Sequence, residues 1–409
     1  MLFNIIKPFT SLQIIRNVRL LGNISKTSAI LSNENITKYM SRPRENFNSR
    51  QASIKSEAST YTTSIDECMS CFHELTTTLT INQNKEVADA TKRFTRTLKY
   101  NVPKGKRNRV RATVTAYKIL ESKVRLTPEN LRLAQMLGWC IELLNAAMLI
   151  EDDIMDASTT RRGSPCWYLV EDIGMHALSD AVLVENSVYN ILKTYFSRHK
   201  CYSHVMDLFH RTTLLSALGQ SIDSQRATEN GLCNLDFYSE HIYEKLVKYK
   251  THYYTCEFPV RAALYLAEKF DHEQYKSYFQ ILYDLSYYYQ LQNDFLDCFG
   301  SASLTGKDGT DIQEGKCTWL IMTALHKANT AQRQILAENY GKCDTRNVSI
   351  VRNLFKELKI PETYFSLENN ISNVIQERIH NVHSTMRLPD ILFYEMMNLM
   401  CKNVSNYRD

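Results

Sequence analysis

The strongest chemical signal in the sequence is a group of three aspartates at the end of an apolar stretch. Asp152 and Asp156 are four residues apart, so they share one face of a helix, and Asp153 lies beside them. Carboxylates crowded at the end of an apolar helix repel one another and are costly to desolvate. A divalent cation removes that conflict, and hard oxygen ligands of this kind suit Mg²⁺. The segment therefore predicts a magnesium site, with an ordinary solvated acidic helix end as the alternative.

Two arginines follow the aspartates within a few residues. Arg161 and Arg162 place two fixed cations near the expected metal site. The fork of an arginine side chain matches the oxygens of a phosphate group. A metal ion combined with arginines is what a bound diphosphate requires, so the spacing predicts a diphosphate-binding site.

A second acidic group lies further along the chain. Asn293 and Asp297 are four residues apart, and Asp294 and Asp297 are three apart, so they lie close to one helical face. Several basic residues accompany the two acidic groups, among them Lys106, Arg109, Lys250, Lys307 and Lys316. Any one of these is more often a solvated charge. Together they describe two acidic faces and several cations, as a diphosphate bridged by Mg²⁺ needs.

The elements that must position these residues are helices. Glycine (12) and proline (8) are scarce among the 409 residues, which argues against many short strands joined by tight turns. Long segments show apolar residues at spacings of three and four, as helices do. They are 129–154, 179–196, 202–222, 236–268, 272–299, 318–340 and 348–358. We predict a single all-α domain over residues 64–409.

The net charge of +5 arises in the first part of the chain. Residues 1–65 hold nine basic and three acidic residues, which leaves 40 of the 49 basic and 41 of the 44 acidic residues for the rest. No nucleic-acid-binding face follows from this distribution. Residues 1–63 have no acid before Glu34 and place apolar residues near helical spacing between arginines, which predicts a mitochondrial transit peptide. A disordered cytosolic extension is the alternative.

Two further patterns indicate no function. The most apolar stretch, 139–150, is interrupted by Glu142 and Asn145, so we predict no membrane span. The eleven cysteines are scattered, which suits a reduced compartment. Cys68 and Cys71 form a C-x-x-C pair without a second pair, and we interpret them as structural.

The order and spacing of the motifs resemble those of the trans-isoprenyl diphosphate synthases of farnesyl diphosphate synthase type. The resemblance covers about residues 64–400. In chain order, the motifs are Tyr100-Asn101, Gly105-Lys106-x-Asn108-Arg109, Glu142-Leu143-Leu144, Asp152-Asp153-Ile154-Met155-Asp156, Arg161-Arg162-Gly163, Cys166-Trp167-Tyr168, Gly219-Gln220, Tyr249-Lys250-Thr251, Asp294 to Gly300, Gly306-Lys307, Gly309 to Gln313 and Lys316-Cys317. The resemblance implies the isoprenoid synthase fold, a helical bundle around a deep apolar cavity, and commonly a homodimer.

The resemblance also assigns roles by position. The first aspartate-rich motif, Asp152, Asp153 and Asp156, and the second, Asn293, Asp294 and Asp297, are implied to hold three Mg²⁺ ions. Groups matching the allylic diphosphate site are Arg161, Lys250, Thr251, Gln290, Lys307 and Lys316. Groups matching the isopentenyl diphosphate site are Lys106, Arg109, Asn145 and Arg162. The implied chemistry is metal-assisted ionisation, in which cations stabilise the departing diphosphate. The catalytic groups are then Asp152, Asp156, Arg161 and Lys250.

Several positions depart from the family pattern. Asn293 stands where the family has an aspartate that binds the third magnesium, and terpene cyclases of this fold often have asparagine there. On the isopentenyl diphosphate side, Asn145 replaces a glutamine and Lys104 replaces a glycine. Residues 401–409 lack the basic run that closes over this diphosphate. These changes weaken the second substrate site and keep the first.

We therefore expect a terpene synthase, similar to those that arose from this scaffold in insects, which ionises one prenyl diphosphate and releases a terpene. Ala147 and Met148 replace residues that are usually aromatic in animal farnesyl synthases, which deepens the cavity and favours farnesyl diphosphate as substrate. The first alternative is a chain-elongating prenyltransferase, because Lys106, Arg109 and Arg162 remain. The second is a non-catalytic partner subunit, which the retained acidic motif disfavours.

Overall fold

The computed structural model describes residues 61–80, 85–225, 228–229, 232–271, 275–301, 305–306, 308–383, 388–401 and 404. The transit peptide predicted within residues 1–63 falls almost wholly outside these residues, and it stays a prediction. The same holds for the tail after position 401, apart from residue 404, and for the role of Lys307.

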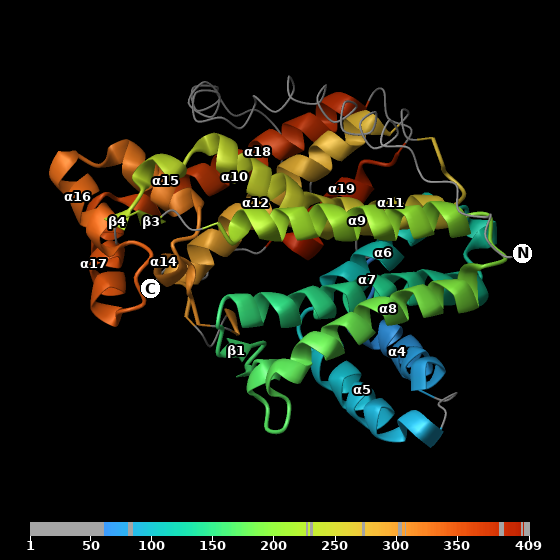
Figure 1. The fold of residues 1–409 in the computed structure, drawn as a ribbon. Coiled ribbons are helices and arrows are strands. Elements are labelled where there is room, and N and C mark those ends of the chain that lie inside the picture. The colour runs from blue at the N-terminus through green and yellow to red at the C-terminus, as the bar shows by residue number, and fades with distance from the viewer. Residues whose placement is uncertain are drawn as a thin grey trace, which may run out of the picture. The chain divides into compact units, whose positions relative to one another are not determined.

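Helices dominate the described chain (Figure 1). The α-helices are α4 (Ile65–Thr80), α5 (Ala88–Asn101), α6 (Asn108–Leu120), α7 (Pro128–Met155), α8 (Ala177–Phe196), α9 (Tyr202–Asp223), α10 (Glu240–Leu246), α11 (Phe258–Leu266), α12 (Lys276–Phe299), α14 (Asp311–Glu314), α15 (Trp319–Lys327), α16 (Thr330–Asn339), α17 (Thr345–Glu357), α18 (Ile360–His383) and α19 (Ile391–Met400). A π-helix, η7 (Val247–Glu257), joins α10 to α11. The all-α prediction is confirmed.

The remaining elements are short. The 3-10 turns are η2 (Lys85–Val87), η3 (Lys123–Arg125), η4 (Trp167–Leu169), η5 (Gly174–His176) and η6 (Leu235–Phe237). Two antiparallel hairpins pair β1 (Thr160–Arg161) with β2 (Ser164–Pro165) and β3 (Thr228–Glu229) with β4 (Leu232–Cys233).

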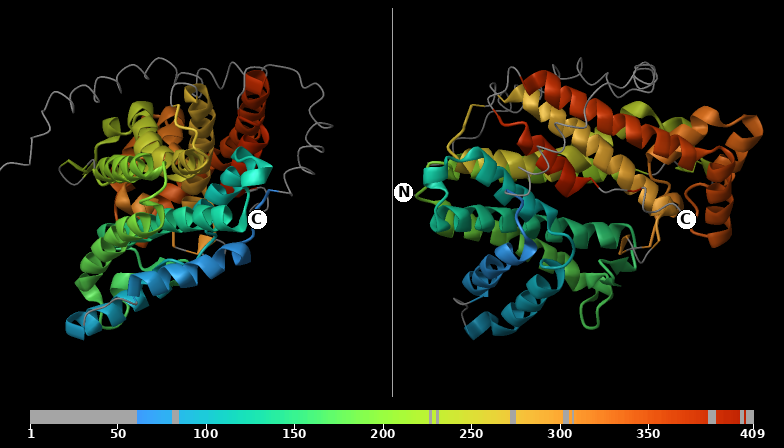
Figure 2. Two further views of the ribbon diagram at one scale, coloured as in Figure 1. Left: turned by 90° about the vertical axis from the view of Figure 1, so that its right-hand side faces the viewer. Right: turned by 180° about the vertical axis from the view of Figure 1, so that it is seen from behind.

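The helix α7 lies at the centre of this arrangement. Pro128 fills its first turn, and the Thr127 hydroxyl accepts a hydrogen bond from the Asn130 amide at 3.2 Å, which fixes the start of the helix. Its side chains are apolar on nearly every side because it packs against α4, α6, α8 and α11. In Figure 2, α4 and α5 (blue) lie on one side of α6 and α7, and α12, α18 and α19 lie on the other.

The length and hydropathy of α7 are those of a possible membrane span. Within the described residues it is the one helix long and apolar enough, and 89% of its most apolar 18-residue window is buried inside the structure. Such burial is that of a core helix. The indole of Trp139 donates to the Cys68 carbonyl at 2.8 Å, which attaches α4 to it.

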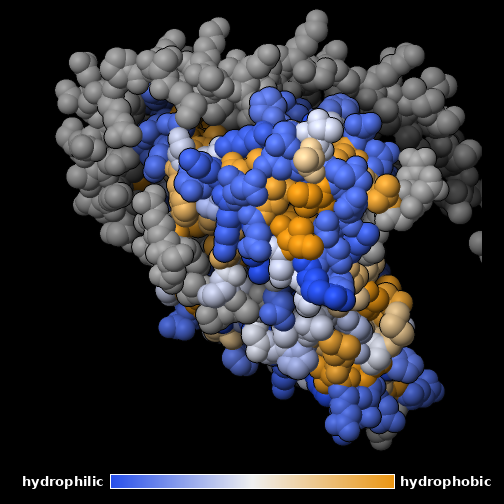
Figure 3. Space-filling model, turned by 90° about the vertical axis from the view of Figure 1, so that its left-hand side faces the viewer, coloured by the Kyte–Doolittle hydropathy of each residue, from blue (hydrophilic) through white to orange (hydrophobic). Residues whose placement is uncertain are grey.

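The two helices that carry the acidic groups, α7 and α12, end on the same side, near β1 and α14 (Figure 1). The Gly163 amide, between β1 and β2, donates to the Gly306 carbonyl, beyond α12, at 2.9 Å. A Cβ at position 306 would lie 3.3 Å from Arg162 Cα, so the segments touch through their main chains. Figure 3 views this end of the molecule, where hydrophilic side chains surround separate hydrophobic patches.

Candidate active site

Three carboxylates from two helices converge on two lysines. Asp156, which caps α7, accepts a hydrogen bond from Lys316 Nζ at 2.9 Å, and Asp223, the last residue of α9, accepts one from the same Nζ at 2.8 Å. Lys250 Nζ lies 2.5 Å from Asp223 Oδ2 and 3.3 Å from Asp152 Oδ1. Lys250 therefore bridges two carboxylates, and Lys316, whose Nζ also lies 3.2 Å from Glu314 Oε2, contacts three. We call Asp152, Asp156, Asp223, Lys250 and Lys316 the carboxylate cluster.

The charges in the carboxylate cluster sustain one another. Burial alone raises the pKa of Asp152, but Lys250, Arg161 and Lys316 outweigh burial and lower that pKa to about 2. The two lysines likewise lower the pKa of Asp223 against its burial. Burial lowers the pKa of Lys250 and Lys316, and the neighbouring carboxylates more than reverse this. Asp152 and Asp223 are therefore ionised and both lysines protonated at neutral pH.

The carboxylate cluster has the donor set that Mg²⁺ prefers. Its carboxylates supply hard oxygens, and the two ammonium groups occupy positions where positive charge is stabilised. In the part of the chain that the structure describes, no three carboxylate, histidine or cysteine side chains already surround one point closely enough to hold an ion. The residues therefore fit ions that share their coordination with a diphosphate, and the lysines must make room when such ions bind.

Arg161 is held by the middle aspartate. Its Nε donates to Asp153 Oδ1 at 2.8 Å, and its Nη2 lies 2.5 Å from the same oxygen and 3.4 Å from Asp152 Oδ2. Burial raises the pKa of Asp153, and Arg161 opposes that shift. In this geometry Asp153 positions Arg161, and its predicted role as a metal ligand gains no support.

A close helix crossing brings Lys250 to the carboxylate cluster. Gly219 of α9 packs against the backbone of η7, and a Cβ at this position would lie 2.4 Å from the Lys250 amide nitrogen. Because glycine has no side chain, the two helices approach closely enough for Lys250 to reach Asp223, one turn further along α9. The neighbouring Gln220 donates to Asp152 Oδ1 at 2.9 Å. The crossing thus joins α7, α9 and η7.

A buried contact between His252 and Glu257 spans one turn of the π-helix η7. His252 Nε2 lies 3.0 Å from Glu257 Oε2, and a spacing of five residues matches the repeat of a π-helix. Arg261 donates to Glu257 Oε1 from Nε at 2.9 Å and from Nη2 at 2.6 Å. Burial alone raises the pKa of Glu257, but Arg261 and His252 lower it to about 2. This pairing fixes the turn that presents Lys250 and Thr251.

The second acidic group is divided between the site and the core. Asp294 is 2% exposed, and its Oδ2 accepts from the Tyr243 hydroxyl and the Trp319 amide, both at 2.9 Å. Its Oδ1 accepts from Gln290 Nε2 at 2.8 Å, and Thr251 donates to the other end of that amide at 2.5 Å. Burial raises the pKa of Asp294 to about 7, although these hydrogen bonds oppose the shift. Here Asp294, on α12, joins α10 and α15 directly and η7 through Gln290, and its predicted role as a metal ligand gains no support.

Asn293 and Asp297 lie one turn apart on α12. The Asp297 Oδ1 accepts from the Asp311 amide at 2.9 Å, which starts α14. A Cβ at Gly309 would lie 1.8 Å from the Asp297 carbonyl oxygen, so only glycine fits there. Asn293 is half-buried. These two residues remain the predicted ligands on α12.

Arg109 is the centre of the predicted isopentenyl diphosphate site. Its Nη2 donates to Thr255 Oγ1 at 3.1 Å, and its guanidinium lies 4.2 Å from the centroid of the Tyr254 ring. Its Nε is buried and has no hydrogen-bond partner within the described chain. Asn145 accepts from the Tyr254 hydroxyl and donates to Glu142 Oε2 at 3.4 Å. Asn145 therefore belongs to the framework, while Arg109 keeps a donor for a ligand.

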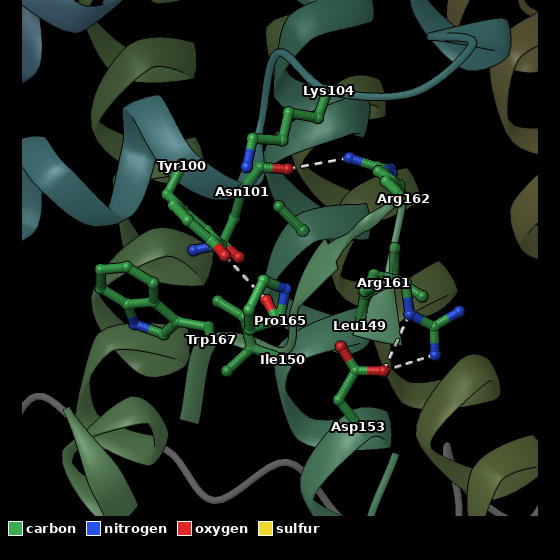
Figure 4. Close-up of a pocket in the computed structure, with 11 residues that line it drawn as sticks. Tyr100, Asn101, Lys104, Leu149, Ile150, Asp153, Arg161, Arg162, Pro165 and Trp167 are labelled. Atoms are coloured by element: carbon green, nitrogen blue, oxygen red, sulfur yellow. Dashed lines mark hydrogen bonds and ion pairs between the residues drawn. The ribbon is translucent and has the colours of Figure 1, made fainter. Parts of the chain in front are cut away.

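The other predicted groups on this side are more dispersed. Arg162 Nη1 donates to the Asn101 carbonyl at 2.8 Å and lines a pocket with Lys104 (Figure 4). Lys106 is exposed in the turn before α6. The structure thus brings Arg109 and Arg162 into one neighbourhood, because the positive charge of Arg109 helps to lower the pKa of Arg162.

Sequence reasoning missed Asp223, and it gave Gln220 no role although Gly219-Gln220 was among the motifs of the resemblance. Asp223 completes the carboxylate cluster, and Gln220 orients Asp152. Gln220 and Asp223 are three residues apart near the end of a helix, so their spacing did place them on one face. Only the crossing at Gly219 shows that this face meets the aspartates of α7.

Comparisons with known proteins agree with this geometry. The sequence model of the polyprenyl synthetase family matches residues 91–358 of this chain. Farnesyl pyrophosphate synthase of Gallus gallus is 41% identical over 308 residues, which are 75% of this chain and 83% of that protein. The enzyme of Saccharomyces cerevisiae is 40% identical over 291 residues, covering 71% and 82%. The structure of T. brucei farnesyl diphosphate synthase complexed with risedronate has a TM-score of 0.74 at 27% identity and covers 82% of this chain and 97% of that one.

The helical frame and the site on it define an all-α isoprenoid synthase fold. The chain belongs to the polyprenyl synthetase family. Enzymes of this family use Mg²⁺ and take prenyl diphosphate substrates.

The prediction of a terpene synthase is wrong. The relatives are farnesyl pyrophosphate synthases, which are chain-elongating prenyltransferases and not lyases. Farnesyl pyrophosphate synthase of the insect Nezara viridula, 35% identical over 330 residues (81% of this chain, 80% of that protein), bears the same name. The error came from three departures taken as loss of the second substrate site. In the structure, Asn145 is tied into the framework and Arg109 and Arg162 are kept.

Proposed function

We propose that this protein is a chain-elongating prenyltransferase that condenses isopentenyl diphosphate with an allylic diphosphate. The observation that carries the proposal is the presence of two separate sets of cations. Lys250, Lys316 and Arg161 pair with carboxylates, whereas Arg109 and Arg162 donate to a hydroxyl and a carbonyl. Two diphosphate substrates need two such sets, and only one of them needs metal ligands.

On the allylic side, bound Mg²⁺ acts as a Lewis acid that stabilises the leaving diphosphate. Asp152, Asp156 and Asp223, with Asn293 and Asp297 on α12, are the residues that would hold the ions, and a count of three ions is part of this proposal. Arg161 and Lys250 bind the diphosphate oxygens. The allylic C–O bond breaks, and the diphosphate departs with the electron pair.

On the other side, Arg109 and Arg162 hold isopentenyl diphosphate. Its double bond attacks the allylic carbon, a C–C bond forms, and the carbon next to the resulting cation gives its proton to an oxygen of the released diphosphate. The buried, unpartnered Nε of Arg109 supports this role, because a donor buried without a partner costs free energy that a phosphate oxygen would recover.

The test supplies the purified protein with Mg²⁺, dimethylallyl diphosphate and isopentenyl diphosphate. We expect longer prenyl diphosphates as products. Isopentenyl diphosphate consumption no faster than in a buffer blank, by protein shown to be folded, would contradict the proposal. A parallel reaction with farnesyl diphosphate alone should release no hydrocarbon.

Product length is proposed to depend on Met148. Met148, Asp152 and Asp156 follow one another at spacings of four, so Met148 lies one turn deeper on the same face of α7. Replacing Met148 by phenylalanine should shorten the products, because the growing chain meets a larger group at that depth. Chromatography of the dephosphorylated products measures the shift. An unchanged distribution would place the growing chain elsewhere.

We also propose a homodimer formed through α8 and α9. These neighbouring helices run along the front of Figure 1. Both expose large apolar side chains. They include Leu178 (44% exposed), Val182 (53%), Leu214 (62%) and Leu218 (48%). Exposed apolar side chains gathered on neighbouring elements favour association with a second copy.

A further inference from the structure

The pocket in Figure 4 lies beside Arg162 and contains a cation that the proposed reaction has not used. It lies between the end of α5, the end of α7 and the β1–β2 hairpin and is partly open to solvent. Lys104 reaches into it from the turn after α5. Its Nζ lies 3.6 Å from the centroid of the Tyr100 ring and donates to Ser164 Oγ at 3.1 Å.

Three cations line the pocket, and the polar partners of two of them, Lys104 and Arg162, are neutral. Lys104 contacts an aromatic ring and a hydroxyl, and Arg162 contacts the Asn101 carbonyl. The one carboxylate that lines the pocket, Asp153, is engaged by Arg161. The pocket therefore carries positive charge that none of its lining groups compensates.

A third cation, Arg109, interacts electrostatically with Arg162. Burial lowers the pKa of Lys104, and Arg162 lowers it further. Burial also lowers the pKa of Arg162; Glu142 opposes this, while Arg109 adds to it. Lys104, Arg162 and Arg109 thus repel one another in sequence. Glu142 offsets part of the charge of Arg109 and Arg162, and an anion bound beside Lys104 and Arg162 would reduce the remaining repulsion.

We propose that Lys104 is a specificity-determining residue that binds the diphosphate of isopentenyl diphosphate together with Arg162 and Arg109. The inference rests on the proposed prenyltransferase function. The isopentenyl substrate is favoured over the allylic one because the allylic diphosphate is neutralised by metal ions and by lysines already paired with carboxylates. A diphosphate held without metal ions depends on side-chain cations alone, so one more lysine has a large effect.

The local backbone lets Lys104 move while Arg162 stays fixed. Gly105 has φ +88°, and a Cβ there would lie 2.8 Å from Arg162 Nε, so the guanidinium is packed against the turn. Lys104 has a flexible four-carbon arm and can leave the Tyr100 ring for a phosphate oxygen. Asn145 is not free to contact a phosphate oxygen in this way, because its side-chain amide is hydrogen-bonded to Tyr254 and Glu142.

The test compares Lys104→Gln with wild type in steady-state kinetics. KM for isopentenyl diphosphate should rise about tenfold, as expected for the loss of one charge-assisted hydrogen bond, and KM for the allylic diphosphate should change less than about twofold. Lys104→Arg should restore most of the affinity. The matched control is Lys99→Gln, which removes an exposed lysine of the same helix end and should leave both KM values unchanged.

A second measurement does not depend on turnover. Isothermal titration of inorganic pyrophosphate in EDTA should show weaker binding to Lys104→Gln than to wild type and to Lys99→Gln. Equal pyrophosphate affinity, or equal rises in both KM values, would overturn the role of Lys104 while leaving the prenyltransferase proposal intact. A wild-type protein that does not elongate overturns the prenyltransferase proposal, and with it the assignment of this pocket to isopentenyl diphosphate. Circular dichroism shows whether each variant is folded.

Discussion

At the residue scale, the site is organised around lysines that already neutralise carboxylates. Lys316 lies between Asp156 and Asp223, and Lys250 between Asp223 and Asp152. The like charges of α7 and α9 can therefore be brought together without a metal ion. Binding of Mg²⁺ then exchanges one set of cations for another and needs no folding step. We expect EDTA to abolish activity without unfolding the protein.

Replacing Lys316 by methionine tests this exchange. Without a metal ion, Asp156 and Asp223 then lose the cation that they share, and we expect a loss of about 2 kcal/mol of unfolding free energy in EDTA. Mg²⁺ should raise the Tm of the variant more than that of wild type. Lys193→Met, at an exposed position of α8, is the control. If Mg²⁺ raised the Tm of the variant and of wild type equally, Lys316 would not take the place of a metal ion. Thermal unfolding with and without Mg²⁺ measures the difference.

A pH-dependent prediction concerns Glu257. Its pKa is about 2 in the folded protein and about 4.5 in the unfolded chain, so the carboxylate stabilises the fold above pH 4.5 and loses this effect as the pH falls toward 2. The shift corresponds to about 3 kcal/mol at neutral pH. Glu257→Gln should lose roughly that amount at pH 7.

The difference in unfolding free energy between Glu257→Gln and wild type should become about 1 kcal/mol smaller as the pH falls from 5.5 to 3.5. Denaturant unfolding at both pH values measures it. The exposed Glu240→Gln serves as control and should match wild type at each pH. A difference that does not change with pH would assign the loss to packing.

At the scale of elements, the site depends on how closely α9 approaches η7. Gly219 allows the approach, and the pair His252–Glu257 spans the turn of η7 that carries Lys250. Neither feature follows from hydrophobic periodicity. The spacing of apolar residues from 236 to 268 predicts one continuous helix, whereas the structure divides it into α10, η7 and α11.

Replacing Gly219 by alanine should therefore harm both fold and activity. Alanine favours a helix, but its Cβ would lie 2.4 Å from the Lys250 amide nitrogen, so the helices must separate. We expect a loss of about 1–3 kcal/mol of unfolding free energy. The rate of elongation should fall as well, because Lys250 moves away from Asp152. Ser221→Ala, on the exposed side of the same helix, should leave both quantities near wild type. Wild-type stability in Gly219→Ala would mean that the crossing relaxes freely.

The predictability of the site differs from residue to residue for physical reasons. Asp152 and Asp156 are found from their spacing because a helix fixes which residues share a face. The orientation of Asp294 is set by Tyr243 and Trp319, which come from other elements, and the position of Asp223 by a helix crossing. Such tertiary contacts leave no trace in local spacing. The all-α fold, in contrast, follows from scarce glycine and proline and from long periodic segments.

At the scale of the whole molecule, the proposed homodimer through the apolar face of α8 and α9 can be tested in solution. Leu214→Glu should convert the dimer into monomers, because a charge at the centre of an apolar interface must be desolvated. Light scattering coupled to size-exclusion chromatography gives the mass. Ile350→Glu, at an exposed apolar position of α17, is the control and should remain dimeric. A wild-type monomer would refute the homodimer proposal.

We also propose that residues 1–63 direct the protein to mitochondria, as their basic and amphipathic composition suggests. Import of the radiolabelled full chain into isolated mitochondria, with protection from added protease, tests this proposal. A chain without residues 1–63 should stay outside and be digested. Equal protection of the two chains would contradict a targeting role.

The hydrogen bond from the Gly163 amide to the Gly306 carbonyl, 2.9 Å long, has a consequence for how the enzyme tolerates sequence drift. Its donor follows one acidic segment and its acceptor follows the other, and both are main-chain atoms of residues without side chains. Substitutions elsewhere in these loops can alter charge and specificity while the tether between the two halves of the catalytic centre persists. Variants with new substrate preferences can therefore be sought in the surrounding loop residues, with both glycines left in place.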